Sequence, residues 1–445
     1  MLFQPPDALN KTPGGHVGSA FVEVQPVDDA PVSNPPIEQE REAVPLTTPA
    51  EGVPLVIADA EALAEAADKL AAGTGPVAVD TERASGYRYS QRAYLIQLRR
   101  TGSGSFLVDP VALRGHVEPL AGALKGTEWV LHAASQDLPC LAELDLRPDS
   151  LFDTELAGRL AGFERVALGT MVERLLGYQL EKGHGAADWS QRPLPEDWLT
   201  YAALDVELLI PLRDELETEL AAQGKLAWAL EEFEAVRTAG PPKPRAEPWR
   251  RTSGIHRMRN PRQLAAIRAL WEARDHLARE RDIAPGRVLP DRAVVEAASL
   301  DPVSEAELIK LPVFRGRAQR RLAGTWARAL KAARELPKNE LPDPSPAHDG
   351  PPQPNRWADR DPDAAARLTA ARSALTAIAE AHRLPVENLL QPELARRLCW
   401  TPPEDGSDAG VAEALRAGGA RNWQIELTGT ALAKALTTTA PHPAE

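Results

Sequence analysis

Apolar and polar positions in the first half of the chain follow the pattern of short buried strands interrupted by helical stretches. A stretch rich in alanine, 58–73, has helical spacing and ends at a glycine. After it come short apolar runs bounded by turn residues, which predict strands. These runs are VAVD (77–80), RAYLIQLRR (92–100), SFLVDP (105–110) and WVLHA (129–133).

Helical patterns follow the last of these strands. Residues 151–162, 168–177 and 196–224 each place apolar side chains three and four positions apart. Three closely spaced strands, followed by helix, strand and helix, favour a mixed sheet covered by helices. The first unit is therefore predicted to be an α/β domain.

The remainder of the chain has a helical pattern and contains an internal repeat. Residues 278–290 align with 379–391, and 320–333 align with 425–438. Both copies carry the run L-x-G-T near their ends. Two diverged copies of one small helical bundle explain this likeness.

Prolines mark the boundaries between these units. The chain has 41 prolines, about twice the usual share. Residues 1–52 are rich in proline and acid, which is typical of a disordered tail. Residues 239–248 and 337–356 have the composition of stiff linkers. The predicted folded units are the α/β domain 53–238, the helical bundle 249–336 and the second, diverged bundle 357–440.

Composition excludes several classes of protein. Hydrophobic residues make up 43% and charged residues 26% of the chain, which is ordinary for globular domains. No apolar run approaches the length of a membrane span, and no export signal is recognised. Cys140 and Cys399 are too few for a disulfide framework and lack zinc-site spacing. We expect a soluble cytoplasmic protein without a membrane partner, and the sequence identifies no protein partner.

Charge is distributed unevenly along the chain. The formal net charge is −13, which by itself disfavours nucleic acid as a partner. Residues 243–338, however, carry 22 Lys and Arg against 11 Asp and Glu, whereas residues 53–242 carry 17 against 30. One basic module between acidic ones is expected where a single domain meets phosphates. Solvated helix faces are the alternative explanation.

Two acidic side chains stand at the end of the first predicted strand. Asp80 and Glu82 are two apart, so on a strand they project to the same face. Paired buried carboxylates repel each other unless a cation holds them, and oxygen ligands suit Mg²⁺ or Mn²⁺. The same tripeptide recurs at Asp153-Thr154-Glu155, where a helix begins and Asp153 is better explained as an N-cap.

Two more acidic positions are informative only in combination. Asp137 follows the strand that ends near His132 and opens a helix, a position typical of a cap or a solvated residue. Tyr201 and Asp205 are four apart on an amphipathic helix and therefore lie on one face. Taken alone, that pair is typical of half-buried packing.

In this order and spacing, Asp80, Glu82, Asp137 and Tyr201-x-x-x-Asp205 resemble the tyrosine-bearing branch of the DEDD exonuclease superfamily. Neighbouring segments extend the likeness to the ribonuclease D family, and the basic bundle is similar to the helicase-and-RNase-D C-terminal (HRDC) domain. The segments are LIQL (95–98), HAASQDL (132–138), FDTELAGRLAG (152–162), ADWSQRPL (187–194), RVLPD (287–291) and LIKLPVF (308–314).

The resemblance implies a ribonuclease H-like mixed sheet followed by two HRDC-like bundles, and a 3′–5′ exoribonuclease that releases nucleoside 5′-monophosphates. It also implies two divalent cations, Mg²⁺ or Mn²⁺, about 3.5–4 Å apart. Asp80 would bridge both ions, Glu82 and Asp205 would complete one site, and Asp137 would serve the other. Tyr201 would orient the attacking water, because an ordinary tyrosine pKa of about 10 makes a poor base at neutral pH.

The expected partner is RNA with a free 3′ end, such as tRNA precursors and other small structured RNAs. A DNA exonuclease of repair is an alternative, since discrimination rests on the 2′-OH. A catalytically silent nucleic-acid-binding adaptor is the alternative from another class. The basic-bundle side chains predicted to contact RNA phosphates are Arg250, Arg251, Arg257, Arg259 and Arg262.

Three residues of the first domain are further candidates for nucleic-acid contact. Lys182 opens the run KGH, where the family often has lysine–serine. The retained lysine is a candidate for a phosphate contact. The departure from serine bears on how the substrate is positioned. His184 in that run is expected to be a loop residue. Gln97 is expected either to contact a base or sugar or to make a hydrogen bond at the sheet edge. Arg192 is expected either to pair with Asp188 or to contact a phosphate.

Overall fold

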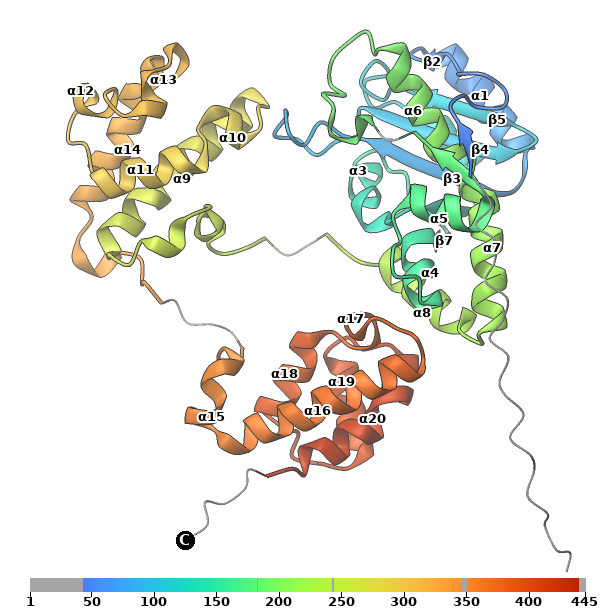
Figure 1. Ribbon diagram of the computed structural model, residues 1–445. Helices are drawn as coiled ribbons and strands as arrows, with labels where there is room; N and C mark the ends of the chain where they lie inside the picture. Colours follow the sequence, from blue (N-terminus) through green and yellow to red (C-terminus); the bar gives the residue numbers. More distant parts are fainter. Residues whose placement is uncertain (1–42, 182, 242–243, 346–349, 440–445) are drawn as a thin grey trace, which may run out of the picture. The chain divides into compact units, whose positions relative to one another are not determined.

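The computed structural model describes residues 43–181, 183–241, 244–345 and 350–439 (Figure 1). The first domain is built on a six-stranded sheet in the order β2-β5-β4-β3-β6-β7. Its strands are β2 (Val56–Ile57), β3 (Thr74–Glu82), β4 (Leu95–Thr101), β5 (Gly104–Val108), β6 (Glu128–Leu131) and β7 (Ser150–Asp153). Strands β3, β4 and β5 pair antiparallel, whereas β2, β6 and β7 join in parallel. The predicted mixed sheet is confirmed.

Helices cover this sheet, as predicted. Ala202 and Ala203 of one of them, α6, pack in a cluster with Leu95 and Leu107 of the sheet. The helices of the domain are α1 (Ala60–Ala72), α2 (Glu118–Ala123), α3 (Leu138–Ala142), α4 (Thr154–Ala161), α5 (Leu168–Leu176), α6 (Glu196–Glu207), α7 (Leu209–Ala222) and α8 (Leu226–Arg237). Small alanine side chains let α6 approach the strands closely, so residues on its inner face reach the sheet.

Strand β3 occupies an interior position in the sheet. Val77, Ala78 and Val79 are fully buried, as expected of a strand covered on both faces. Asp80 stands directly opposite Gln97 of β4 in the antiparallel register. The apolar part of β3 thus anchors a strand whose last residues are acidic.

A second, two-stranded sheet was not expected. Its strands, β1 (Val44–Leu46) and β8 (Tyr178–Leu180), pair in parallel. Strand β1 lies inside the segment 1–52 that composition assigned to a disordered tail, so the ordered part of the chain begins before residue 53. A three-residue strand is too short to have a readable period, and its partner lies far along the chain. Residues 1–42 lie outside the described part of the chain.

The basic bundle is helical, as predicted. Its core contains Trp326, Phe314 and Leu270, all fully buried. Its helices are α9 (Pro261–Arg281), α10 (Pro285–Val288), α11 (Asp291–Leu300), α12 (Glu305–Leu308), α13 (Arg317–Arg321) and α14 (Ala323–Glu335). Short 3₁₀ turns, η3 (Pro248–Arg251) and η4 (Ile255–Arg257), precede them.

The last bundle repeats this succession of helices. Helix α17 begins 101 residues after α10, and each follows a long helix, α16 and α9 respectively. The helices are α15 (Trp357–Arg360), α16 (Pro362–Ala381), α17 (Val386–Leu389), α18 (Pro392–Trp400), α19 (Asp408–Ala417) and α20 (Asn422–Leu436). The internal repeat seen in the sequence is therefore a repeat of structure.

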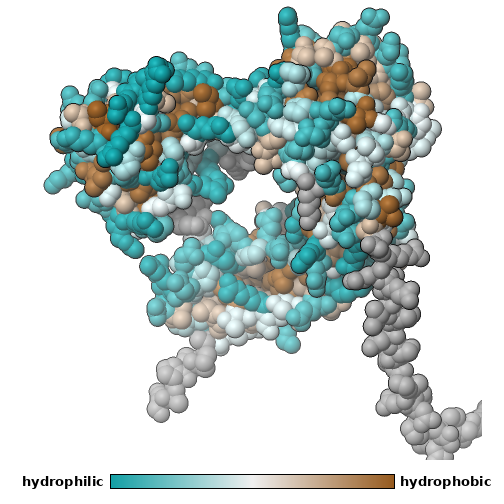
Figure 2. Space-filling view, turned by 45° about the horizontal axis from the view of Figure 1, so that its top comes forward, coloured by the Kyte–Doolittle hydropathy of each residue, from teal (hydrophilic) through white to brown (hydrophobic). Residues whose placement is uncertain are grey.

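The surface of the folded parts is largely polar. Figure 2 shows hydrophilic residues over most of the face in view, with apolar residues gathered in small patches. Among the described residues, the helices are all too short or too polar to span a bilayer.

Candidate active site

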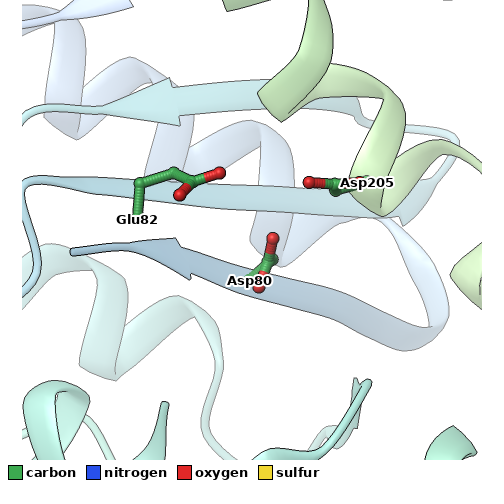
Figure 3. Close-up of side chains that lie close together, drawn as sticks. All are labelled: Asp80, Glu82 and Asp205. Atoms are coloured by element: carbon green, nitrogen blue, oxygen red, sulfur yellow. The ribbon is translucent and has the colours of Figure 1, made fainter. Parts of the chain in front are cut away.

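Three carboxylates meet at the end of strand β3. Asp80 and Glu82 leave the strand on one face, because side chains two apart point the same way. Asp205 reaches them from helix α6, which packs on the sheet. One oxygen of each carboxylate lies within 4.8 Å of the others, and Figure 3 shows the three groups turned toward one another. The structure thus brings together three of the predicted metal ligands.

These three carboxylates resist ionisation, mainly because they are buried. Burial, followed by repulsion from neighbouring carboxylates with Asp137 first, raises the pKa of Asp80 well above its usual value. Burial, then repulsion from Asp205 and Asp137, raises the pKa of Glu82 to about 9. Burial raises the pKa of Asp205 to about 7, and a hydrogen bond from Tyr201 opposes the shift. A divalent cation would offset this repulsion, so the all-oxygen donor set fits a hard metal ion.

The fourth predicted ligand, Asp137, lies between the short turn η1 (Ala134–Gln136) and helix α3. It holds the N-cap position of α3 but makes no side-chain cap bond. Instead, its Oδ1 accepts a 2.6 Å hydrogen bond from Thr81 Oγ1 of strand β3 and lies 3.9 Å from Arg83 Nη2. Burial raises its pKa to about 6, with Thr81 and Arg83 opposing. Asp137 is thus a buried carboxylate directed toward the acidic end of β3.

Tyr201 lies one helical turn before Asp205 on α6. Burial, then repulsion from Asp205 and Glu82, raises the pKa of its hydroxyl above the ordinary tyrosine value. The hydroxyl therefore stays protonated in the neutral range. The tyrosine ring meets the His184 ring edge-on, with centroids 5.7 Å apart. A Cβ atom on Gly185 would lie 3.5 Å from the tyrosine oxygen, which places this residue directly beside the hydroxyl.

Known proteins share both the fold and the order of domains. Residues 54–221 match the family model of a 3′-5′ exonuclease, 263–330 that of the HRDC domain, and 350–436 that of a 3′ to 5′ exonuclease C-terminal domain. The ribonuclease D of Acidiphilium cryptum is 34% identical over 302 residues, which cover 65% of this chain and 74% of that protein. This chain belongs to the ribonuclease D family.

Solved structures agree with membership of the ribonuclease D family. A protein from Bifidobacterium adolescentis is 39% identical with a TM-score of 0.83, covering 89% of this chain and 100% of that chain. Escherichia coli RNase D, described as an exoribonuclease involved in structured RNA processing, is 27% identical with a TM-score of 0.62. That match covers 86% of this chain and 98% of the E. coli chain. As a ribonuclease D, this chain is a 3′–5′ exoribonuclease.

The first-domain residues predicted to meet nucleic acid have varied surroundings in this ribonuclease D. Gln97 is fully buried, and neither polar atom of its side chain has a hydrogen-bond partner among the described residues. Arg192 donates a 2.6 Å hydrogen bond to Asp109 and does not pair with Asp188. Lys182 lies outside the described residues. A contact between any of these three side chains and RNA stays a prediction.

The predicted arginines of the basic bundle also divide into two sets. Arg250 donates a 2.6 Å hydrogen bond to the Glu247 carboxylate. Its guanidinium carbon lies 4.3 Å from the centre of the Trp249 ring. Arg262 donates to backbone carbonyls at the end of α14. Of the five predicted arginines, those that are exposed and make no hydrogen bond or ion pair within the described part of the chain are Arg251, Arg257 and Arg259. These three are free to meet a phosphate without giving up a protein contact.

Sequence reasoning missed three residues that support the ribonuclease D site. Thr81 and Arg83 contact Asp137, and both alternate with the acidic residues of β3, a position that the strand period could have marked. His184 packs on Tyr201 although it was expected to be a plain loop residue. His184 lies in the turn η2 (His184–Ala186) and Tyr201 lies in helix α6. Because these are separate elements, only the folded structure shows the contact.

Proposed function

We propose that this ribonuclease D acts in the cytoplasm and removes nucleotides one at a time from small structured RNAs, tRNA precursors among them, with two divalent cations, Mg²⁺ or Mn²⁺. The observation that carries the proposal is the cluster of Asp80, Glu82 and Asp205 with Asp137 beside it. Buried carboxylates with raised pKa values become stable anions when cations neutralise them. The description of the E. coli enzyme supports the substrate class.

The four carboxylates divide the work of holding the cations. Asp80, Glu82 and Asp205 would hold one ion, and Asp80 with Asp137 the other. Bound there, the ions supply an activated water and stabilise charge on the leaving 3′ oxygen. Thr81 and Arg83 fix the direction of the Asp137 carboxylate, since one donates a hydrogen bond to it and the other lies close as a cation.

Tyr201 would orient the attacking water. Its hydroxyl is neutral because burial and the nearby carboxylates raise its pKa. A neutral hydroxyl both donates and accepts hydrogen bonds but takes no proton from water. The tyrosine would therefore position the nucleophile and would not act as its base.

The basic bundle would hold the body of the RNA. Three of its exposed arginines, Arg251, Arg257 and Arg259, lie on or beside the turns η3 and η4. Contacts to phosphates give affinity without reading sequence, which suits an enzyme acting on RNAs that share only a free 3′ end. The acidic second bundle lacks this density of arginine, and we assign it no RNA contact.

The test uses end-labelled RNA and matched DNA, each with a 3′ overhang, incubated with Mn²⁺, Mg²⁺ or EDTA. We expect a ladder of single-nucleotide steps from the 3′ end, on RNA, with either metal and not with EDTA. Equal ladders on DNA would replace the RNA proposal by a repair exonuclease. Binding without cleavage under both metals would favour a silent adaptor. A tRNA precursor with a 3′ extension, compared with its mature form, tests the substrate.

A further inference from the structure

The carboxylate of Asp153 is shared between two parts of the exonuclease domain. Asp153 ends strand β7 and is 4% exposed. Its Oδ1 accepts hydrogen bonds from the amides of Glu155 and Leu156, at 3.0 and 3.2 Å, and so caps α4 as predicted. The same carboxylate accepts bonds from the amides of Ala133 and Ala134, at 3.1 and 2.9 Å. Capping requires only the first pair, so the second pair needs another explanation.

The second pair holds the turn that delivers Asp137. Ala133 has a φ of +60°, in the left-handed region that a residue with a Cβ atom seldom adopts. From there, the amides of Gln136 and Asp137 bond back to the carbonyls of Ala133 and Ala134, at 2.9 and 3.1 Å. The two residues whose amides bond to Asp153 are therefore the ones whose carbonyls close the Asp137 turn.

The two oxygens of Asp153 do different work. Oδ1 serves Glu155, Leu156 and Ala133, whereas Oδ2 serves Ala134 alone. A cap residue with a single oxygen would leave the Ala134 amide without this acceptor inside a buried turn, where an unpaired amide is costly. Both oxygens are needed only if the cap of α4 and the turn after β6 are to be held at once.

We propose that Asp153 is a positioning residue for the metal ligand Asp137. It fixes the backbone of the turn, while Thr81 fixes the direction of the Asp137 side chain. This inference rests on the proposed metal-dependent function, because the residue that Asp153 would position, Asp137, is a proposed metal ligand. A cap without this second role would affect the stability of α4 and leave the site unchanged.

The decisive variant separates the two roles. Asp153→Asn keeps one oxygen for the α4 amides, since asparagine is a good N-cap, but turns an NH₂ group toward the Ala134 amide. The matched control is Asp59→Asn at the start of α1, where the side chain accepts only from the amides of Glu61 and Ala62. Both variants lose one charge at a helix N-terminus, and only the first touches the Asp137 turn.

The primary readout is Mn²⁺ binding to the RNA-free full-length protein, measured by titration calorimetry. We expect Asp153→Asn to weaken binding of one ion by about 10- to 100-fold, the usual effect of losing a residue that orients a metal ligand. The affected ion should be the one that Asp137→Asn also loses. The Mn²⁺ concentration for half-maximal exonuclease rate should rise in parallel. Asp59→Asn should bind Mn²⁺ as the wild type does, with a smaller change in melting temperature because its cap bonds are exposed.

Wild-type Mn²⁺ affinity in a folded Asp153→Asn protein would overturn the positioning role, as would an equal loss in Asp59→Asn. If Asp153→Asn does not fold, Asp153→Ser carries the same expectation, because its single hydroxyl still caps α4. Failure of the wild type to bind Mn²⁺, with full activity in Asp80→Asn, would overturn the proposed function and this inference together. Normal wild-type binding with no effect at Asp153 would overturn the inference alone.

Discussion

The tripeptide Asp-Thr-Glu occurs twice in the exonuclease domain, at 80–82 and at 153–155, and the two copies fold differently. The first lies wholly within strand β3. Its Asp80 and Glu82 therefore share a face and meet Asp205. Burial and the neighbouring carboxylates disfavour the charge on both side chains, so a cation is suited to balance it.

The second copy lies across the end of β7 and the start of α4. Asp153 turns back onto backbone amides, and Glu155 pairs with Arg159 one helical turn later at 2.6 Å. The backbone thus decides what the side chains do. The same three residues contribute to a candidate cation site on a strand and form a structural cap at a strand-to-helix junction.

The middle threonines of the two tripeptides show that both copies serve one turn. Thr81 donates to the Asp137 carboxylate at 2.6 Å. Thr154 donates to the Leu131 carbonyl at 3.2 Å and meets the His132 ring at 2.9 Å. The first contact is made to a proposed metal ligand and the second to the residues just before the turn.

The comparison predicts the largest effect for Asp80→Asn. Loss of the carboxylate proposed to contact both cations should lower the exonuclease rate at least about 1,000-fold, an increase of about 4 kcal/mol in the activation free energy. RNA affinity should stay close to that of the wild type, because the proposed contacts to the body of the RNA lie in the basic bundle. Rates come from the end-labelled assay and affinity from filter binding in Ca²⁺. Loss of RNA binding together with activity would contradict this division of work.

The next largest effects are expected for substitutions of the two threonines, and the two variants should differ in which property changes. Thr81→Val removes a donor to Asp137, so the Mn²⁺ concentration for half-maximal rate should rise about 10-fold. Thr154→Val should lower the melting temperature, because it leaves the Leu131 carbonyl short of a donor at a cost of about 1–3 kcal/mol. Its effect on the Mn²⁺ requirement should be the smaller of the two. Equal metal requirements in both variants would show that the two threonines are equivalent.

Metal removal should make stability fall with pH. Burial and repulsion raise the folded-state pKa of Glu82 to about 9 and of Asp205 to about 7. Because the folded state then holds protons that the unfolded state has released, stability is lost as pH rises from the unfolded pKa values toward these folded ones. In EDTA, the melting temperature should fall between about pH 5 and 9, by about 2–4 °C for each kcal/mol lost.

Two controls accompany the pH series. Mn²⁺ should restore the melting temperature at the alkaline end, where the carboxylates are ionised and bind it best. Asp80→Asn removes one repelling charge and should flatten the decline. A melting temperature in EDTA that rises with pH would show that these carboxylates are not destabilising when ionised.

The smallest effect is expected for Glu155→Gln, the counterpart of Glu82 in the second tripeptide. Its ion pair with Arg159 joins partly exposed groups one turn apart, and such pairs contribute about 0.3–0.5 kcal/mol. Exonuclease rate and Mn²⁺ affinity should match the wild type. A large loss of activity would mean that the second tripeptide takes part in the reaction directly.

Much of the fold and of the site could be predicted because its signals are local. Strands β3 to β6 have short apolar runs, and α6 has helical spacing. Asp80, Glu82 and Asp205 stand in recognisable places on those elements. Their grouping with Asp137 and Tyr201 depended on a resemblance to a family, because each carboxylate alone has a common structural explanation.

What could not be predicted depends on contacts between distant residues. Parallel pairing of β6 and β7 sets Leu131 opposite Asp153, and that register brings the Ala133 amide to the Asp153 carboxylate. Arg192 pairs with Asp109 on a different element and not with its neighbour in sequence. No periodicity encodes such pairs, since they arise only when the sheet closes.

The catalytic cluster also has a consequence for how the protein is made. Asp80 belongs to an early strand and Asp205 to a helix near the other end of the domain. Synthesis proceeds from the N-terminus, so a nascent chain that still lacks α6 carries an incomplete ligand set. The carboxylate cluster can therefore form only after α6 has been synthesised and has packed on the sheet.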